Sequence, residues 1–368
     1  MSINNFKFAI ISDLHIALSH TISDNPYRFH QVEVSIPVLE LILEELSALK
    51  IDFLLSPGDL TQHGEIDNHK WLSDRLSKLP FPVYVVPGNH DIPLISSNNN
   101  TIGFNDFPYY YGKFGYDNPE QLYYTCEVLP GVRLIGLNSN NFNEEDSQIG
   151  RLDEKQLRWL KEVLSEVNDQ LVMIMIHHNI LEHLPGQATH PLGKRYMLEN
   201  APELREILQK AGVKLIFTGH LHAQDITYQD DIYEITTGSL VSYPHPYRIL
   251  ELKTDKRGKK WLDVASYKIK SIAECPNLAE KSREWIGDRN LPFTMKLLTE
   301  YPLNLSLSEA QKFAPSLRYF WADICHGDAI FNFNDFPPPV KHYFENFSAI
   351  NRQNGCLELI DNFTTFLV

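Results

Sequence analysis

A chain of 368 residues with 43% hydrophobic residues is long enough to bury a large core and to divide into two units. Its formal charge of −14 argues against a general polynucleotide binder, because such a protein needs a basic face to neutralise phosphates. The N-terminus carries no long apolar segment and no run approaches the length of a membrane span, so we expect a cytoplasmic protein without a membrane anchor.

Cysteine usage further limits the kinds of site to expect. Cys126, Cys275, Cys325 and Cys356 are widely separated, and the sequence contains no Cys-x-x-Cys pair. A structural zinc knot therefore has no support, and we expect free thiols in a reducing compartment.

The first ninety residues alternate apolar runs with amphipathic segments. Strands are predicted where short runs are rich in aliphatic and aromatic residues, at residues 7–12, 51–55 and 81–86. Helices are predicted at residues 31–50 and 65–78, the first beginning at Pro37 if that proline interrupts it. This β-α-β-α-β order predicts parallel strands joined by right-handed crossovers.

The middle of the chain predicts a second series of strands. Residues 92–121 show no clear period, and their aromatic stretch at 107–116 serves either as surface packing or as a lid on the substrate side. Later strands are predicted at residues 122–128, 132–138, 171–176, 213–218, 224–228, 232–236, 247–252 and 261–269, with helices at 153–167 and 195–211. Hairpins that follow a β-α series suggest two packed sheets instead of one open sheet.

Beyond about residue 272 the strand-like alternation stops. Helices are predicted there at residues 279–286, 293–299, 307–314 and 340–347. Ser306 and Glu309 form the pattern of a capping box that would start the third helix, and Pro315 should end it. We therefore expect a main domain at residues 1–272 and a helical extension at 273–368, which forms a cap or a contact between copies in a homo-oligomer.

Side chains that can bind metal follow five of the predicted strands. The motifs are Ser12-Asp13-Leu14-His15, Pro57-Gly58-Asp59, Pro87-Gly88-Asn89-His90-Asp91, His177-His178 and Gly219-His220-Leu221-His222. Each alone would be an ordinary turn, surface pair or structural histidine. Because ligands bind at the carboxyl ends of strands in α/β proteins, all five together predict a metal site. Asp13 and His15 would share one face of an extended segment, and Asp59 has two oxygens with which to bridge two cations.

This set of motifs resembles the signature of calcineurin-like metallophosphoesterases. Its spacing is similar to the branch of class III cyclic nucleotide phosphodiesterases and glycerophosphodiesterases, and Leu198-Glu199-Asn200 resembles that branch as well. Asn179-Ile180 departs from it, since prolines often follow the paired histidines there. The resemblance spans roughly residues 6–270. It implies a four-layer α-β-β-α sandwich of two mixed sheets flanked by helices.

The resemblance also implies two metal ions and a role for each motif residue. One metal would be held by Asp13, His15, Asp59 and His222, and the other by Asp59, Asn89, His177 and His220. The nitrogen and oxygen ligands without thiolate leave Mn, Fe, Zn or Co open. His90 would contact the phosphate or the leaving oxygen with Asp91 orienting it, while His178 would lie behind the ligands or in the core.

The resemblance to this branch implies a phosphodiesterase that cleaves small diesters, with 3′,5′-cyclic nucleotides as candidate substrates, through a hydroxide that bridges the two metals. A diester monoanion needs less positive charge than a monoester dianion, and Lys and Arg are sparse beside the motifs. The alternatives are a phosphomonoesterase or nuclease of the same superfamily, and a metal-binding scaffold without catalysis. Further substrate contacts are conceivable at six positions, for which solvated loop residues are the simpler interpretation: His183, His190, Lys194, Arg195, His245 and Tyr247.

Overall fold

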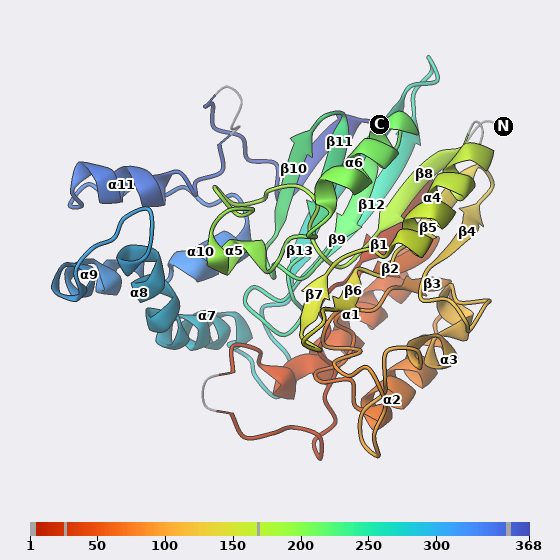
Figure 1. Cartoon of the computed structure of the whole chain (residues 1–368), viewed down its shortest axis with the longest axis horizontal. Helices are drawn as coiled ribbons and strands as arrows, with labels where there is room; N and C mark the ends of the chain where they lie inside the picture. The colour runs from red at the N-terminus through yellow and green to blue at the C-terminus, as the bar shows by residue number, and fades with distance from the viewer. Residues whose placement is uncertain (1–4, 26–27, 168–169, 351–354) are drawn as a thin grey trace.

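Two six-stranded mixed sheets pack face to face, and helices cover their outer faces (Figure 1). The computed structural model describes residues 5–25, 28–167, 170–350 and 355–368. The predicted sandwich of two mixed sheets flanked by helices is confirmed. No helix in these ranges is long and apolar enough to cross a membrane.

The first sheet contains the strands that carry the first three motifs. Its order is β14 (Phe363–Leu367), β13 (Lys260–Lys268), β12 (Pro246–Thr254), β1 (Phe6–Ile10), β2 (Phe53–Ser56) and β3 (Val83–Val85). Strands β1, β2 and β3 are parallel, as predicted, whereas β12 pairs antiparallel with β1. The carboxyl ends of β1, β2 and β3 therefore meet at one edge of this sheet.

The second sheet carries the two histidine motifs. Its order is β10 (Asp225–Gln229), β11 (Ile232–Thr236), β9 (Leu215–Thr218), β8 (Leu171–Met175), β5 (Val132–Gly136) and β4 (Tyr124–Leu129). Strands β5, β8, β9 and β11 are parallel, and the predicted hairpins β4–β5 and β10–β11 are confirmed. A small hairpin of β6 (Asn140–Phe142) and β7 (Gln148–Gly150) was not predicted, because its strands are short and polar.

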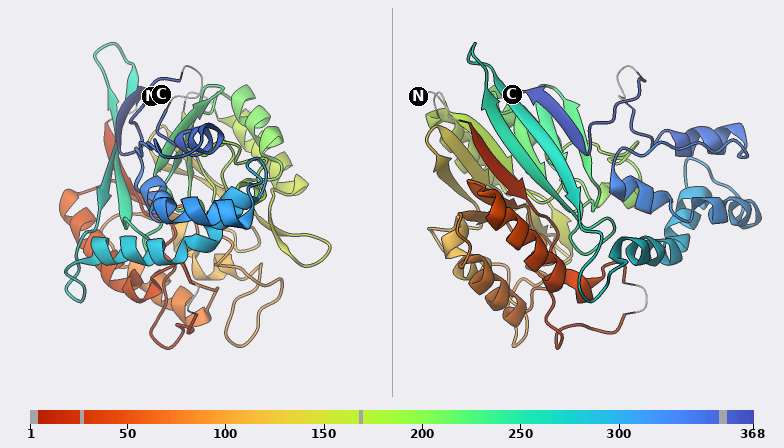
Figure 2. Two further views of the ribbon diagram at one scale, coloured as in Figure 1. Left: turned by 90° about the vertical axis from the view of Figure 1, so that its left-hand side faces the viewer. Right: turned by 180° about the vertical axis from the view of Figure 1, so that it is seen from behind.

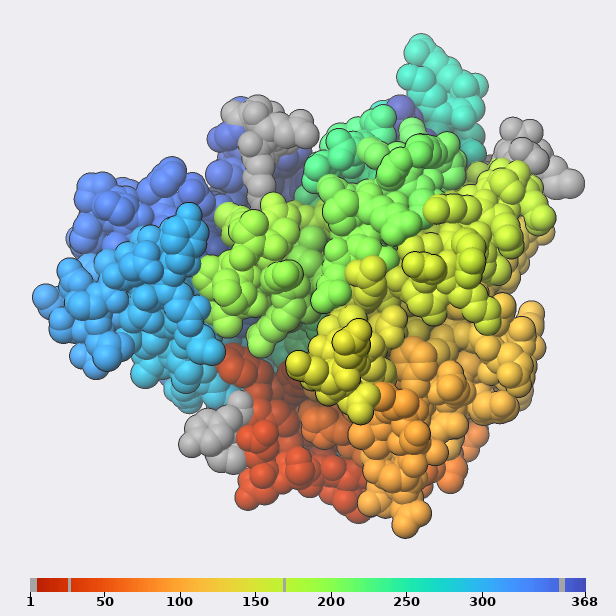
Figure 3. Space-filling model, viewed as in Figure 1, coloured from red at the N-terminus to blue at the C-terminus, as the bar shows by residue number. Residues whose placement is uncertain are grey.

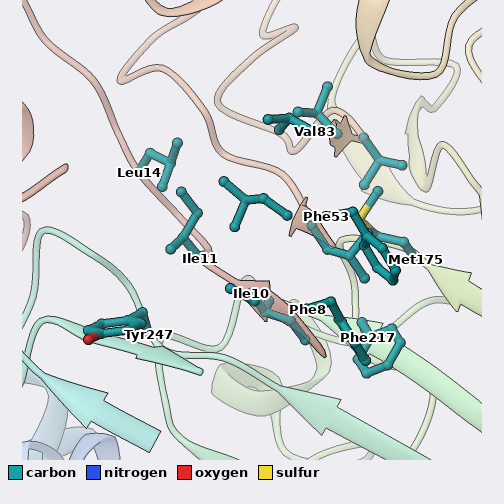
Figure 4. Packing of buried hydrophobic residues seen from close by; sticks show 14 of the residues in the cluster. Phe8, Ile10, Ile11, Leu14, Phe53, Val83, Met175, Phe217 and Tyr247 are labelled. Atoms are coloured by element: carbon teal, nitrogen blue, oxygen red, sulfur yellow. The ribbon is translucent and has the colours of Figure 1, made fainter. Parts of the chain in front are cut away.

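The two sheets share an apolar interior. Met173 and Met175 of β8 belong to the cluster between the sheets, whereas Ile174 belongs to the cluster under the helices, so both faces of this strand are buried. The rings of Phe8 and Phe217, from opposite sheets, lie 5.6 Å apart edge to face (Figure 4). Burial on both faces explains why these strands are continuous apolar runs in the sequence.

The flanking helices largely follow the prediction. They are α1 (Ser35–Leu49), α2 (Ile66–Leu76), α4 (Glu154–Glu166) and α6 (Ala201–Lys210), with a 3₁₀ turn at Val32–Val34 before α1. Pro37 lies in the first turn of α1 and does not interrupt it. The predicted start of a helix at residue 195 is wrong. Asn200 exchanges hydrogen bonds with the backbone of Leu152, and Pro202 marks the first turn of α6.

The aromatic stretch after β3 is packed and does not form a lid. It contains α3 (Phe107–Tyr110) and a 3₁₀ turn at Gly112–Phe114. Phe107, Tyr111 and Tyr116 are buried, and the Tyr111 hydroxyl lies 3.0 Å from Nδ1 of His69 on α2. Of the two uses weighed for this stretch, packing is therefore the one that the contacts support.

Most of the chain after residue 272 forms a separate helical cluster beside the sheets (Figures 1 and 2). The helices are α7 (Leu278–Arg289), α8 (Leu291–Thr299), α9 (Leu307–Phe313), α10 (Phe320–His326) and α11 (Pro338–Glu345). The capping box of Ser306 and Glu309 is confirmed, and a 3₁₀ turn at Ala314–Leu317 follows α9. The expectation of helices alone is incomplete, because β14 returns to pair with β13 at the edge of the first sheet (Figure 2).

Candidate metal centre

The structure brings all seven predicted ligand residues into one cluster between the two sheets' strand ends. Two groups of candidate ligand atoms share Asp59, and within each group all atoms lie within 4.8 Å of one another. The groups are Asp13, His15, Asp59 and His222, and Asp59, His177 and His220. Asn89 joins the second group, because its Oδ1 lies 3.2 Å from Nε2 of His177.

The motif backbones turn sharply at the strand ends. Five predicted ligands have left-handed φ angles between 43° and 66°: Asp13, His15, Asp59, His220 and His222. The expectation that Asp13 and His15 share a face of an extended segment is therefore wrong. Left-handed conformations are unfavourable for side chains with a Cβ, and several in one site are typical of functional centres that the surrounding fold holds in place.

Glycines in the motifs make room for the carboxylates. A Cβ on Gly88 would lie 2.2 Å from Oδ1 of Asp59, and one on Gly219 would lie 2.5 Å from Oδ2 of Asp13. Gly88 is thus required because the Asp59 carboxylate lies directly against its Cα, and not because its backbone is left-handed. Any side chain at either position would displace a candidate ligand.

Hydrogen bonds fix which ring nitrogens face the cluster. Nδ1 of His177 donates to the carbonyl of Pro57 at 2.8 Å, so Nε2 is the nitrogen that faces Asp59 Oδ2, 3.4 Å away. Burial would lower the pKa of His177, but the Asp59 carboxylate outweighs burial and raises it to about 9, so a metal ion would have to displace the proton on Nε2. Nε2 of His220 donates to the carbonyl of Arg195 at 3.2 Å, which leaves Nδ1 with the lone pair. Carbonyl partners of this kind set the tautomer of a metal-binding imidazole.

The donor set fits divalent cations. Burial lowers the pKa of His15 and of His220, and neighbouring histidines lower it further, so both rings are neutral. Burial opposes ionisation of Asp59, but His177 and His90 outweigh it and lower the pKa of this carboxyl. Nε2 of His15 and Nε2 of His222 lie only 3.4 Å apart. Neutral imidazoles that converge on an ionised carboxylate are in the form that metals bind.

His90 lies at the edge of the cluster with one ring nitrogen occupied. Its backbone N–H donates to Oδ1 of Asp59 at 2.8 Å, and its Nδ1 lies 2.6 Å from the carbonyl of Gln62. The ring is thus oriented by Gln62, and Nε2 is the nitrogen left for another partner.

Asp91 has partners other than the expected His90 ring. Its carboxylate accepts hydrogen bonds from the backbone N–H groups of Leu60, Thr61 and Gly88 at 2.8–3.0 Å. Burial, together with the charge of Asp59, raises its pKa to about 7 against these hydrogen bonds. Asp91 therefore ties the motif around Asp59 to the motif around Asn89.

Two histidines near the cluster were missed by the sequence analysis. The His30 ring lies 4.0 Å from that of His15 and 4.8 Å from that of His222, and these three residues form a further candidate group. His63 stacks on His90 at 5.6 Å. No strand precedes His30, and long-range hydrogen bonds position its loop, so the sequence carries no local signal for it.

Of the other loop residues considered, only Lys194 and Arg195 reach the pocket beside the cluster. His178 contacts Ser139 Oγ at 2.7 Å, behind the candidate ligands. His245 is buried and Tyr247 bonds to Glu45, while His190 caps the short helix α5 (Pro191–Lys194). The interpretation of His183, His245 and Tyr247 as solvated loop residues is wrong, because all three are buried and Tyr247 lies in β12.

His183 belongs to a buried ion-pair network away from the pocket. Its Nδ1 lies 2.6 Å from Oδ2 of Asp225, and its Nε2 lies 3.2 Å from Oε1 of Glu234. Burial would lower the pKa of His183, but the two carboxylates outweigh burial and raise it to about 9. This histidine therefore has a structural role.

A pocket of about 820 Å³ opens beside the candidate ligands. Besides the strand-end motifs, its lining includes the N-terminal loop at Phe29 and His30, β7, the loop around α5, and helices α7, α8 and α10. Figure 3 shows the green surface around α5 adjoining the light-blue surface of the C-terminal helices. A volume of this size accommodates a small organic molecule.

Two packed mixed sheets with histidines and carboxylates gathered at their strand ends are the arrangement expected of a metallophosphoesterase. A model of the calcineurin-like phosphoesterase family matches residues 6–224. The chain belongs to this family, whose members hydrolyse phosphoric esters at a dinuclear metal centre.

Individual relatives are more distant. A protein of Arcobacter nitrofigilis named as a probable glycerophosphodiester phosphodiesterase is 24% identical over 70% of this chain and 86% of its own length. The 3′,5′-cyclic adenosine monophosphate phosphodiesterase of Haemophilus influenzae is 22% identical over the same shares. A dimetal phosphatase from Danio rerio superposes with a TM-score of 0.53 at 17% identity, covering 72% of this chain and 96% of its own, and so supports the fold.

Proposed function

We propose that this protein is a dinuclear metal-dependent phosphodiesterase that hydrolyses small diesters, with 3′,5′-cyclic nucleotides as candidate substrates. The observation that carries the proposal is the convergence of seven ligand side chains from five strand ends around Asp59. One cation would be held by Asp13, His15, Asp59 and His222, and the second by Asp59, Asn89, His177 and His220. When bound, the two cations supply Lewis acidity and lower the pKa of a coordinated water.

His90 and Asp91, which are not metal ligands in this scheme, would bind the substrate and position the motifs around it. His90 is placed one residue from Asn89 with its Nδ1 engaged by Gln62, so its Nε2 can contact a phosphate oxygen or protonate the leaving oxygen. Asp91 positions the two motifs that flank this step. Two divalent cations against two ligand carboxylates leave about two positive charges, enough to attract a phosphodiester to an acidic protein.

The choice of a diester rests chiefly on the two relatives named as phosphodiesterases. The scarcity of Lys and Arg beside the motifs supports a diester less than expected, because Lys194, Arg195 and Lys296 line the pocket from other segments of the chain. A monoesterase or nuclease of the same family remains the alternative. Cytoplasmic location, and Mn or Fe as the native metals, stay predictions.

Two substrates distinguish these functions after reconstitution of metal-free protein with Mn²⁺. We expect bis(p-nitrophenyl) phosphate to have a higher kcat/KM than p-nitrophenyl phosphate. A tenfold preference for the monoester, about 1.4 kcal/mol of transition-state discrimination, would overturn the diester proposal. Hydrolysis of neither ester, with two metals bound, would favour the scaffold without catalysis. The Asp59→Asn variant serves as the control for contaminating activity.

The division of the chain at residue 272 is also a proposal. It is supported by a core cluster of the C-terminal helices that is distinct from the two clusters of the sandwich. The pairing of β14 with β13 means that the two units share the first sheet. A role of the helices as an oligomer contact is tested by measuring the molar mass in solution.

A further inference from the structure

We propose that the C-terminal helices form a subsite for the aromatic base of a nucleotide, across the pocket from the candidate metal ligands. This subsite depends on the proposed phosphodiesterase function and names the class of substrate that it would select. The helices lie outside residues 6–224, the part of the chain that matches the family model. The base subsite would therefore be a property of this chain beyond the shared metal centre.

The pocket is continuous from the metal centre to the helices. Its lining includes Asn89, His90, His220 and His222 of the candidate metal centre together with Ile286, Pro292, Phe293 and Trp321 of the C-terminal helices. A phosphate group alone fills only a small part of 820 Å³. The pocket thus has room for a substantial organic group attached to the phosphate.

The C-terminal helices contribute two aromatic rings to the lining of the pocket. Phe293 of α8 and Trp321 of α10 are both half-buried, and their ring centroids lie 5.2 Å apart. Tyr196 of the loop after α5 lines the same pocket and packs on the same cluster as Phe293 and Trp321, with its ring 5.0 Å from that of His220 and the Arg195 guanidinium 4.7 Å from its centroid. Three rings in one pocket favour a flat aromatic group over glycerol or a sugar, since bases stack on aromatic side chains.

Charge complements this arrangement. Lys194, Arg195 and Lys296 are exposed side chains that line the same pocket, next to the aromatic residues. A purely apolar alkyl chain would make no use of these cations. A nucleotide would use both features, because its base would stack on the rings while these cations add to the attraction of the metal centre for its phosphate.

The aromatic wall is held in place relative to the metal centre from two sides. Leu221, between His220 and His222, belongs to the same buried cluster as Leu297, Leu298 and Phe320 of the helices. On the other side, Nε1 of Trp285 on α7 donates to the carbonyl of Phe29 at 2.9 Å, one residue from His30. A subsite fixed before binding loses less conformational entropy when the ligand arrives.

Two ligands that share a ribose and a phosphate, only one of which carries a base, test the base subsite by binding affinity without relying on turnover. Calorimetry on the Mn²⁺-reconstituted protein would measure Kd for adenosine 5′-monophosphate and for ribose 5-phosphate. We expect the nucleotide to bind roughly 5- to 100-fold more tightly, the range that stacking on aromatic side chains provides. Phe293→Ala and Trp321→Ala should each remove most of that ratio and leave the Kd of ribose 5-phosphate unchanged.

Phe313→Ala is the matched control. Phe313 is also half-buried against the helical cluster and paired with a ring, that of Phe336 at 4.9 Å, but it does not line the pocket. It should lower the unfolding temperature about as much as Phe293→Ala and keep the ratio of the two Kd values.

Three outcomes would overturn the base subsite: equal Kd values in the parent protein, a ratio unchanged by both pocket variants, or an equal fall in the ratio with Phe313→Ala. Any of these together with hydrolysis of bis(p-nitrophenyl) phosphate would leave the proposed function standing. The converse result, base-dependent binding without hydrolysis of any diester, would support the subsite and refute the phosphodiesterase.

Discussion

Leu221 is the position at which the C-terminal helices can be uncoupled from the metal centre. Its side chain is fully buried within the helical cluster, although its two neighbours in the chain are the candidate ligands His220 and His222. The change Leu221→Ala removes apolar contacts without touching a polar group. It therefore tests whether packing of the helices positions the ligand loop.

The expected loss of unfolding free energy in Leu221→Ala follows from the complete burial of this side chain. A leucine with 0% exposure that is cut to alanine leaves a cavity, and such changes cost about 2–5 kcal/mol of unfolding free energy. We also expect Mn²⁺ to bind about 10–100-fold more weakly, the usual loss when residues that orient ligands are removed. The matched control is Leu298→Ala, because Leu298 is equally buried in the same cluster but lies on α8, away from the ligands.

Two measurements separate stability from metal binding. Denaturant unfolding of the metal-free proteins should give similar losses of free energy for the two variants. Calorimetric titration with Mn²⁺, under conditions where both variants are folded, should show weaker binding for Leu221→Ala alone. Equal Mn²⁺ affinity in the two variants would refute the coupling between the helices and the ligand loop.

Three further predictions concern single side chains. Asp59→Asn should reduce metal content at both sites, because it removes the charge that the two sites share. Asn89→Ala should mainly weaken metal binding at the site that contains His177 and His220. Elemental analysis that finds the same loss of metal in both variants would contradict this prediction. His90→Ala should retain both metals but lose about 10²–10⁴-fold in turnover, and less with nitrophenyl leaving groups; equal loss on all esters would indicate phosphate binding instead of acid catalysis. Because the pKa of His183 is raised to about 9, its ion pairs should stabilise the fold fully below about pH 6.5, and this contribution should be lost as the pH rises through 9, by about 3 kcal/mol at most. His183→Gln should abolish this fall of the unfolding free energy with pH. An unchanged fall in the variant would refute the role of the ion pairs.

The ligands were predictable because their chemistry is local. Each of Asp59, Asn89 and His177 directly follows a short apolar run or its turn, and parallel strands bring such ends together. The seven side chains could therefore be proposed without knowledge of distances. The backbone conformation of Asp13 and His15 was not predictable, because turns and extended segments share the same spacing of residues.

Other features depend on contacts between distant parts of the chain. His30 is held near the cluster because its neighbour Gln31 donates to the carbonyl of Val241 at 2.8 Å, a contact that no pattern near residue 30 indicates. Strand β14 is a five-residue segment with mostly exposed side chains, and only pairing with β13 makes it a strand. The start of α6 was different: Pro202 in its first turn was a local signal that the apolar periodicity obscured.

The metal centre alone does not determine the substrate of this protein, because the C-terminal helices also line the pocket. A shared set of ligands fixes the chemistry at phosphorus, whereas the group attached to the phosphate is selected by whatever faces those ligands. Here the facing surface includes Phe293 and Trp321, from a part of the chain that the family model does not cover. Because Leu221 joins the buried cluster of these helices, we expect a change at Leu221 itself to alter metal affinity and, if the proposed subsite exists, the binding of the base as well. Selectivity in this protein is therefore expected to depend on the C-terminal helices as much as on the strand ends.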